Sequence, residues 1–395
     1  MDREQRRLDH LDGLRGLAAL FVVLHHTWLT VWPFEYGRAP RGWWRATDVL
    51  AYGHFAVGVF IVLSGFCLMR PVVATGSLPG GARAFLRRRA RRILPPYYAA
   101  LAVSLLLIWT VLGRATGTHW DVSVPVTAAG YVGNALLLQD VLGAPQVNHV
   151  FWSIAVECQI YLLFPLLVLV WRRRGPVAAL VLATAASAGL TLLVGAFPLV
   201  GPLRLVGLTP QYLLLFALGA AAAHVCAADR MARIPWTAIA AFATGGLVTA
   251  CAFLHPSPVD PDFRLLDPLV GVATAALLVA TTRPGRRSRV RALLGARAPA
   301  FLGTFAYSVY LIHAPLLQLV WQTLVGPVAL PAGIAFVALA IVGVPLALGG
   351  AYVFYCVCER PFLRPRGYPV TTSGSSSSIV PRTASASLSA SSPGG

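Results

Sequence analysis

Ten runs of about 20 apolar residues dominate this sequence and leave few folds open to it. Inside a bilayer every backbone N–H and C=O must find an internal partner, so runs of this length cross as α-helices. With 57% hydrophobic and 12% charged residues, the chain has too little charge to cover a soluble protein of its size. We therefore predict an all-α fold, a polytopic membrane helix bundle of about ten transmembrane helices, whose runs begin near residues 12, 55, 93, 151, 176, 206, 235, 265, 300 and 333.

Clusters of arginine fall in alternate loops of this bundle. Because basic residues concentrate on the cytoplasmic side, we expect both termini to be cytoplasmic. The bias toward Ala, Arg and Gly indicates a GC-rich bacterial genome, so we expect a multi-pass protein of the bacterial inner (plasma) membrane. The segment 125–142 is expected to be external or re-entrant, since a full crossing there would carry residues 172–174, three arginines, outside. The predicted organisation is a cytoplasmic N-terminus at 1–10, a transmembrane domain at 11–363 and a disordered Ser-rich cytoplasmic tail at 364–395.

Two features that often indicate a function are explained more simply here. Most of the net charge of +18 lies in loops that follow the positive-inside rule, and no nucleic-acid motif accompanies it. The six cysteines are scattered, mostly within apolar runs, with neither paired nor metal-ligand spacing. We expect no nucleic-acid partner, no disulfide and no metal site.

Ionisable residues inside the predicted spans are the strongest indication of a site, because each costs free energy unless it is paired or solvated. Arg15 and His26 are eleven residues apart, which places them on nearly one helix face about 16 Å from each other. A rise of 1.5 Å per residue puts His26, Glu157 and His313 in one layer, about 10 Å below the outer boundary. Three helices thus bring titratable groups to one depth.

Three arginines, Arg15, Arg89 and Arg92, fall instead at the cytoplasmic boundary, where they suit an anionic phosphate group. Plainer interpretations remain open. A basic run beside the membrane serves as a topology signal or contacts lipid headgroups, and Arg15 can extend its head to the interface. His26 is equally compatible with a hydrogen-bonded packing histidine, and its neighbour His25 is expected to point elsewhere.

Glu157 resists a purely structural interpretation, because a carboxylate at this depth needs a proton, a base or a cation. Ser153 and Tyr161 share its helix face at i−4 and i+4. Tyr310 lies three residues before His313, although an interfacial aromatic belt explains the tyrosine as well.

Five motifs follow one another along the chain. They are LDGLRGLAALFVVLHH at 11–26, GVFIVLSGF at 58–66, FLRRRARRILPPYY at 85–98, WSIAVECQIYLLFP at 152–165, and LGTFAYSVYLIHAPLL at 302–317 with ERPF at 359–362. Together they resemble the signatures of the integral-membrane acyltransferase-3 family, which moves acyl groups from cytoplasmic acyl-coenzyme A to hydroxyls of sugars and related acceptors. The first motif assigns the family's histidine to His26. The fourth departs from the family pattern at Ile154 and Cys158.

The resemblance implies a chemistry for these residues. His26 is the implied general base, which deprotonates the acceptor hydroxyl, and Glu157 is implied to orient or polarise the histidine or the acceptor. Acyl-coenzyme A, most simply acetyl-coenzyme A, is a co-substrate, and no permanently bound cofactor is implied. The implied substrate-binding residues are Arg15, Arg89, Arg92, Ser64, Trp152, Ser153, Tyr161, Tyr310, His313, Glu359 and Arg360.

The expected partners are acyl-coenzyme A, a sugar-containing acceptor and the lipid bilayer, with room for a separate extracellular protein. The acceptor class stays open between envelope glycans, lipid-linked sugars and secreted natural products. On location alone, Trp43, Trp44, Asp48 and the stretch 119–149 are candidates to contact it. Because the arginines and His26 are about 16 Å apart, either the pantetheine arm threads between the helices or the acyl group is relayed through a covalent intermediate. We expect threading, since no convincing nucleophile stands out in the sequence. A transporter or flippase without acyl transfer is the alternative class.

Overall fold

The computed structural model describes residues 9–34, 37–197, 199–200, 203–204, 209–228, 233–254, 265–283 and 288–363. This part of the chain is almost entirely helical, apart from loops and a two-residue pairing of antiparallel strands, β1 (Leu199–Val200) with β2 (Leu203–Arg204). The predicted all-α fold class is confirmed. Residues 1–8 of the predicted cytoplasmic N-terminus and the predicted Ser-rich tail at 364–395 lie outside the described residues.

Long helices follow the predicted apolar runs along the chain. They are α1 (Asp9–Val31), α2 (His54–Thr75), α3 (Gly81–Leu107), α6 (Trp152–Ala196), α7 (Gln211–Ala227), α8 (Trp236–Leu254), α9 (Asp267–Thr282), α12 (Ala306–Val320) and α14 (Val344–Phe354). Shorter helices connect them or begin the later spans: η2 (Gly42–Tyr52), η4 (His119–Ser123), α4 (Ala128–Leu136), α5 (Gln139–Leu142), α10 (Arg289–Leu294), α11 (Arg297–Thr304) and α13 (Ala332–Ala338).

Several of these helices are long and apolar enough to cross a membrane. Within the described residues seven meet both conditions: Asp9–Val31, Gly42–Thr75, Gly81–Leu112, Trp152–Ala196, Trp236–Phe253, Ala306–Val328 and Ala332–Phe362. The 45-residue helix α6 breaks at Gly175 (φ 88°, ψ 174°), where two predicted spans meet. The shorter apolar helices α7 and α9 coincide with two further predicted spans. The polytopic helical fold is confirmed, whereas the count of ten and the cytoplasmic termini stay predictions.

The segment 125–142 forms α4 and α5, of nine and four residues. At 1.5 Å per residue the longer of the two measures about 14 Å, less than half of the apolar thickness of a bilayer. Neither helix is long enough to cross, which agrees with an external or re-entrant segment.

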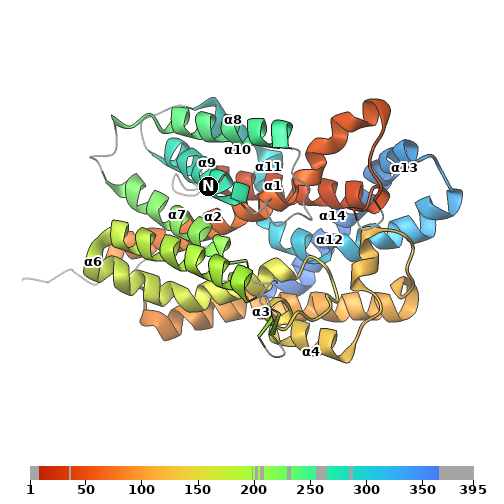
Figure 1. The fold of residues 1–395 in the computed structure, drawn as a ribbon, viewed down its shortest axis with the longest axis horizontal. Helices are drawn as coiled ribbons and strands as arrows, with labels where there is room; N and C mark the ends of the chain where they lie inside the picture. The colour runs from red at the N-terminus through yellow and green to blue at the C-terminus, as the bar shows by residue number, and fades with distance from the viewer. Residues whose placement is uncertain are drawn as a thin grey trace, which may run out of the picture. The chain divides into compact units, whose positions relative to one another are not determined.

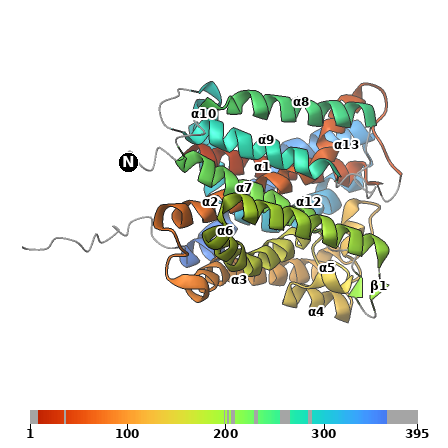
Figure 2. The same cartoon turned by 60° about the vertical axis from the view of Figure 1, so that its left-hand side comes forward.

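Helix α1 lies within the bundle and contacts α2, α11 and α12. Figures 1 and 2 both show α8 and α9 on one side of α1 and α3 and α4 on the opposite side. Helices α2 and α7 cross in close contact. A methyl group added at Gly65 would lie 2.0 Å from the Phe216 carbonyl oxygen, and one at Gly219 would lie 2.0 Å from that of Val62. Small residues let these two backbones touch, as is common between membrane helices.

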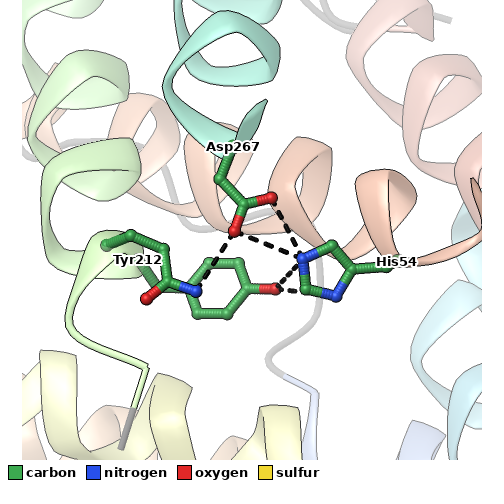
Figure 3. A network of polar contacts seen from close by, with 4 residues as sticks. His54, Tyr212 and Asp267 are labelled. Atoms are coloured by element: carbon green, nitrogen blue, oxygen red, sulfur yellow. Dashed lines mark hydrogen bonds and ion pairs between the residues drawn. The ribbon is translucent and has the colours of Figure 1, made fainter. Parts of the chain in front are cut away.

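A polar network ties α2, α7 and α9 together (Figure 3). His54 Nε2 lies 3.0 and 3.2 Å from the two carboxylate oxygens of Asp267, and the Tyr212 hydroxyl lies 3.1 Å from the same nitrogen. Gln211 Nε2 donates to Asp267 Oδ2 at 3.1 Å. Asp267 is fully buried, so these partners replace the water that its carboxylate loses.

Replacing Asp267 should therefore loosen the bundle. We expect Asp267→Ala to lower the free energy of unfolding by about 2–4 kcal/mol, because His54 and Gln211 lose a buried acceptor. Unfolding in mixed detergent micelles measures the change. Asp48→Ala is the control, since Asp48 pairs with Arg45 at 4.0 Å on the surface and should cost less than about 1 kcal/mol. Equal stability of the two variants would contradict a structural role for the network.

Candidate active site

A cavity of about 130 Å³ lies between α1, α2, α3, α6 and α12. Polar and charged side chains line it together with an apolar wall that includes Phe60 and Ile93. Eight residues that the sequence analysis singles out lie around this one cavity: Arg15, Ser64, Arg89, Arg92, Ser153, Glu157, Tyr161 and Tyr310.

The arginines come from two helices. Arg15 Nη1 donates to Asp12 Oδ1 at 2.8 Å, and its Nη2 lies 3.7 Å from the Cys67 sulfur. Arg89 is half-buried, and its Nε has no hydrogen-bond partner among the described residues. Arg92 is exposed at the edge of the cavity. Because Glu157 is the single carboxylate among the described lining residues, these guanidinium groups favour an anion at this end.

Glu157 belongs to a hydrogen-bonded chain across α6 and α2. The Tyr161 hydroxyl donates to Glu157 Oε1, and Ser64 Oγ lies 2.7 Å from the same hydroxyl. Arg89 is near enough to interact electrostatically with both Tyr161 and Glu157. Glu157 therefore sits on the arginine side of the cavity and forms no hydrogen bond to His26 in the described part of the chain.

A contact between α6 and α12 forms another part of the cavity lining. Ser153 Oγ donates to the Tyr310 hydroxyl at 2.6 Å. As Tyr310 accepts this bond, its own O–H can point to a ligand in the cavity. The Tyr310 ring centroid lies 6.0 Å from that of His313, so the histidines begin directly beyond this contact.

His26 and His313 contact each other, but neither lines the cavity. His313 Nδ1 lies 2.9 Å from the carbonyl oxygens of Val309 and Tyr310 and must carry a hydrogen, because a carbonyl only accepts. His26 Nδ1 lies 2.9 Å from the Val22 carbonyl and 3.1 Å from His313 Nε2. A hydrogen on this nitrogen satisfies both acceptors, which leaves the lone pair of His26 on Nε2.

Three more histidines surround His26. The ring centroids of His25, His149 and His119 lie 4.8, 5.0 and 6.1 Å from it. His25 turns its Nδ1 toward the Leu50 carbonyl at 2.6 Å. His149 precedes α6, and burial together with the neighbouring histidines lowers its pKa well below the usual range. Its ring is therefore neutral at pH 7.

Besides His26 and His313, three further residues of the predicted site lie away from the cavity lining. Trp152 stacks on His54, with ring centroids 6.0 Å apart. The Glu359 carboxylate accepts from the Ser308 backbone N–H at 3.2 Å and from its hydroxyl at 2.5 Å. Arg360 is exposed. Glu359 thus fixes the C-terminal end of the bundle to α12.

Sequence reasoning gave no specific role to His119 and His149, and it did not identify His54 or Asp267. Residues 119 and 149 bound the stretch that the sequence analysis names, on location alone, as a candidate to contact the acceptor. His54 and Asp267 lie at the ends of predicted spans, where polar residues are ordinary. The number of histidines is a usable signal, since five of the nine in the chain gather around one point: His25, His26, His119, His149 and His313.

The chain is similar to several curated bacterial proteins. It is 25% identical to the "Putative peptidoglycan O-acetyltransferase YrhL" of Bacillus subtilis, with 80% of this chain and 50% of that protein covered. It is 23% identical to the "Peptidoglycan O-acetyltransferase OatA" of Listeria monocytogenes, with 78% and 49% covered. It is 29% identical to the "Putative membrane-bound transacylase BcsY" of Komagataeibacter xylinus, with 79% and 73% covered.

The chain spans about half the length of the first two of these relatives. No solved structure matches it. The family model described as "Acyltransferase domain" matches residues 8–356, which include the cavity and the histidines around His26. The protein therefore belongs to the acyltransferase-3 family.

Proposed function

We propose that this protein is a membrane-bound O-acyltransferase that moves an acyl group, in the simplest case acetyl, from acyl-coenzyme A to a hydroxyl of a sugar-containing acceptor. The observation that carries the proposal is the hydrogen-bond chain that leaves a lone pair on His26 Nε2 and connects it through His313 to Tyr310, which lines a cavity that three arginines also line. Family membership and the names of the relatives support the reaction class.

The arginine end suits the phosphates of the donor. Guanidinium groups bind phosphate through two parallel charge-assisted hydrogen bonds, and the unpartnered Nε of Arg89 is one such donor. Glu157, held by Tyr161, keeps Arg89 in place. This is a different role from orienting the histidine, and it follows from the place of Glu157 on the arginine side.

The reaction then takes place at the Tyr310 end. The acceptor hydroxyl gives its proton to His26 Nε2 as its oxygen attacks the thioester carbonyl, so a C–O bond forms. The Tyr310 hydroxyl donates to the developing oxyanion. As the tetrahedral intermediate collapses, the C–S bond breaks and the coenzyme A thiolate leaves, taking up the proton from His26.

His313 acts as a positioning residue in this scheme. Its Nε2 accepts from His26 Nδ1, and the carbonyls of Val309 and Tyr310 fix its own tautomer. The acceptor is expected to reach His26 from the side of His119 and His149, opposite the arginines. By analogy with the two named peptidoglycan O-acetyltransferases, an envelope glycan is the proposed acceptor class, with a separate extracellular partner as an option.

His26→Gln should abolish transfer. The neutral amide cannot take up the proton, so we expect the rate to fall by about 100-fold or more. Membranes are incubated with acetyl-coenzyme A labelled in the acetyl group, and label is followed into lipid, glycan and small-molecule fractions. His224→Gln on α7, whose ring contacts Trp171, is the control and should keep the wild-type rate. Equal labelling by both variants would exclude His26 as the base, and transport of intact thioester without coenzyme A release would favour the flippase alternative.

Arg89→Gln should weaken donor binding. Loss of a charge-assisted phosphate contact raises the KM for acetyl-coenzyme A by about tenfold or more, with a smaller effect on kcat. Initial rates at varied donor concentration provide both constants. Arg91→Gln, an exposed arginine of the same helix, matches the change in charge and should leave KM within about twofold. If both variants raise KM equally, the effect is general electrostatics and not a defined site.

Tyr310→Phe should lower kcat and leave the KM for the donor nearly unchanged. The hydroxyl is assigned to the transition state, so its removal is expected to cost about 100-fold in kcat. Single-turnover transfer of labelled acetyl measures this step. Tyr352→Phe, on the half-exposed tyrosine of α14, serves as the control. An increase in KM without a loss of kcat would assign Tyr310 to ground-state binding.

A further inference from the structure

Three imidazoles from separate parts of the chain converge beside the cavity. His26 belongs to α1, His119 begins η4, and His149 lies in the loop before α6. One nitrogen from each of them lies within 4.8 Å of the other two. The three residues are half-buried and include no carboxylate.

The nitrogen lone pairs of two of these histidines are directed by their other contacts. His26 uses Nδ1 for Val22 and His313, which leaves Nε2 as the ligand atom. His149 places Nδ1 3.5 Å from Ser123 Oγ, while its Nε2 is buried with no hydrogen-bond partner among the described residues. A buried, unpartnered nitrogen costs free energy unless something binds it. A metal-bound histidine usually hydrogen-bonds a neighbouring group through its other ring nitrogen.

We propose that His26, His119 and His149 form a binding site for a divalent transition-metal ion of the zinc type. Three neutral imidazoles with an open fourth position are a common zinc ligand set. With zinc–nitrogen distances near 2 Å, the nitrogens of a tetrahedral site lie about 3.4 Å apart, so the cluster must contract by about 1.4 Å. His119 and His149 lie on short connecting segments, which can make that movement while α1 keeps His26 in place.

Metal binding also has a consequence for catalysis, and this part rests on the proposed function. The lone pair of His26 Nε2 is used either to take the proton of the acceptor or to bind the ion. Occupancy of the site therefore inhibits acyl transfer. The ion at this site is regulatory and is not consumed or oxidised in the reaction.

The binding test uses the full chain purified in detergent and does not depend on activity. Zn²⁺ is titrated by equilibrium dialysis with metal analysis, and Co²⁺ replaces it for absorption spectra. We expect one ion per chain with tetrahedral Co²⁺ bands, and an affinity at least tenfold weaker in both His149→Gln and His119→Gln. His224→Gln is the control and should bind as the wild type does. Substoichiometric binding, octahedral Co²⁺ spectra, or affinity unchanged in both cluster variants would overturn the site.

Misfolding and inhibition are tested separately. Melting temperatures of the two cluster variants must match that of the control, and the use of two variants from different loops guards against the failure of one. In the labelled-acetyl assay, Zn²⁺ should lower the wild-type rate by at least about tenfold, and a chelator should restore it. Activation by Zn²⁺, or inhibition of equal strength in His149→Gln, would refute the inhibitory role. Intact metal binding in a protein without transferase activity would instead refute the proposed function.

Discussion

A buried ionisable side chain is costly unless it is hydrogen-bonded or paired with an opposite charge. In this protein the hydrogen-bond partner comes repeatedly from another helix. Asp267 of α9 is hydrogen-bonded by His54 of α2 and Gln211 of α7, and Glu359 is hydrogen-bonded by Ser308 of α12. Each pairing satisfies a group whose burial would otherwise be costly. The same contacts therefore decide which helices are neighbours.

The candidate site uses this requirement in two different ways. On the arginine side, Arg89 has a donor with no partner among the residues that the structure describes, and an anion could supply the missing hydrogen bond. At the other end, the backbone carbonyls of Val22 and Val309 fix the hydrogens of His26 and His313. Under the proposed function, the first arrangement would bind the phosphates of the donor and the second would provide a base of defined tautomer. Ser153 and Tyr310 line the cavity together with the arginines, and the Tyr310 ring lies 6.0 Å from that of His313.

Much of this organisation could be predicted from the sequence. Apolar runs gave the helices nearly to the residue at His54, Trp152, Trp236 and Asp267, because burial in lipid is a property of each segment by itself. Helical spacing also placed Arg15 and His26 on one face, and depth arithmetic placed His26 near His313.

Contacts between distant residues were harder to predict. The pairing of His54 with Asp267, which are separated by more than 200 residues, depends on how α2 and α9 cross, and no local pattern carries that information. The calculated depth likewise gave the level of Glu157 in the membrane but not the residues that lie beside it. Glu157 lies on α6 one turn from Ser153. In the structure it is close to Arg89, and among the described residues it forms no hydrogen bond to His26. The separation of His119 and His149 from His26 along the chain hid their convergence in the same way.

Arg15 and His26 belong to a single uninterrupted helix, α1, and this has a consequence for the donor. Rearrangement of the other helices can widen or narrow the cavity, but it cannot change the eleven residues that separate these two side chains. Helix α1 thus fixes a separation of about 16 Å between these two residues. Under the proposed function, a thioester whose arm is shorter than this separation would reach Arg15 or His26 but not both, so the length of the donor would decide which thioesters react.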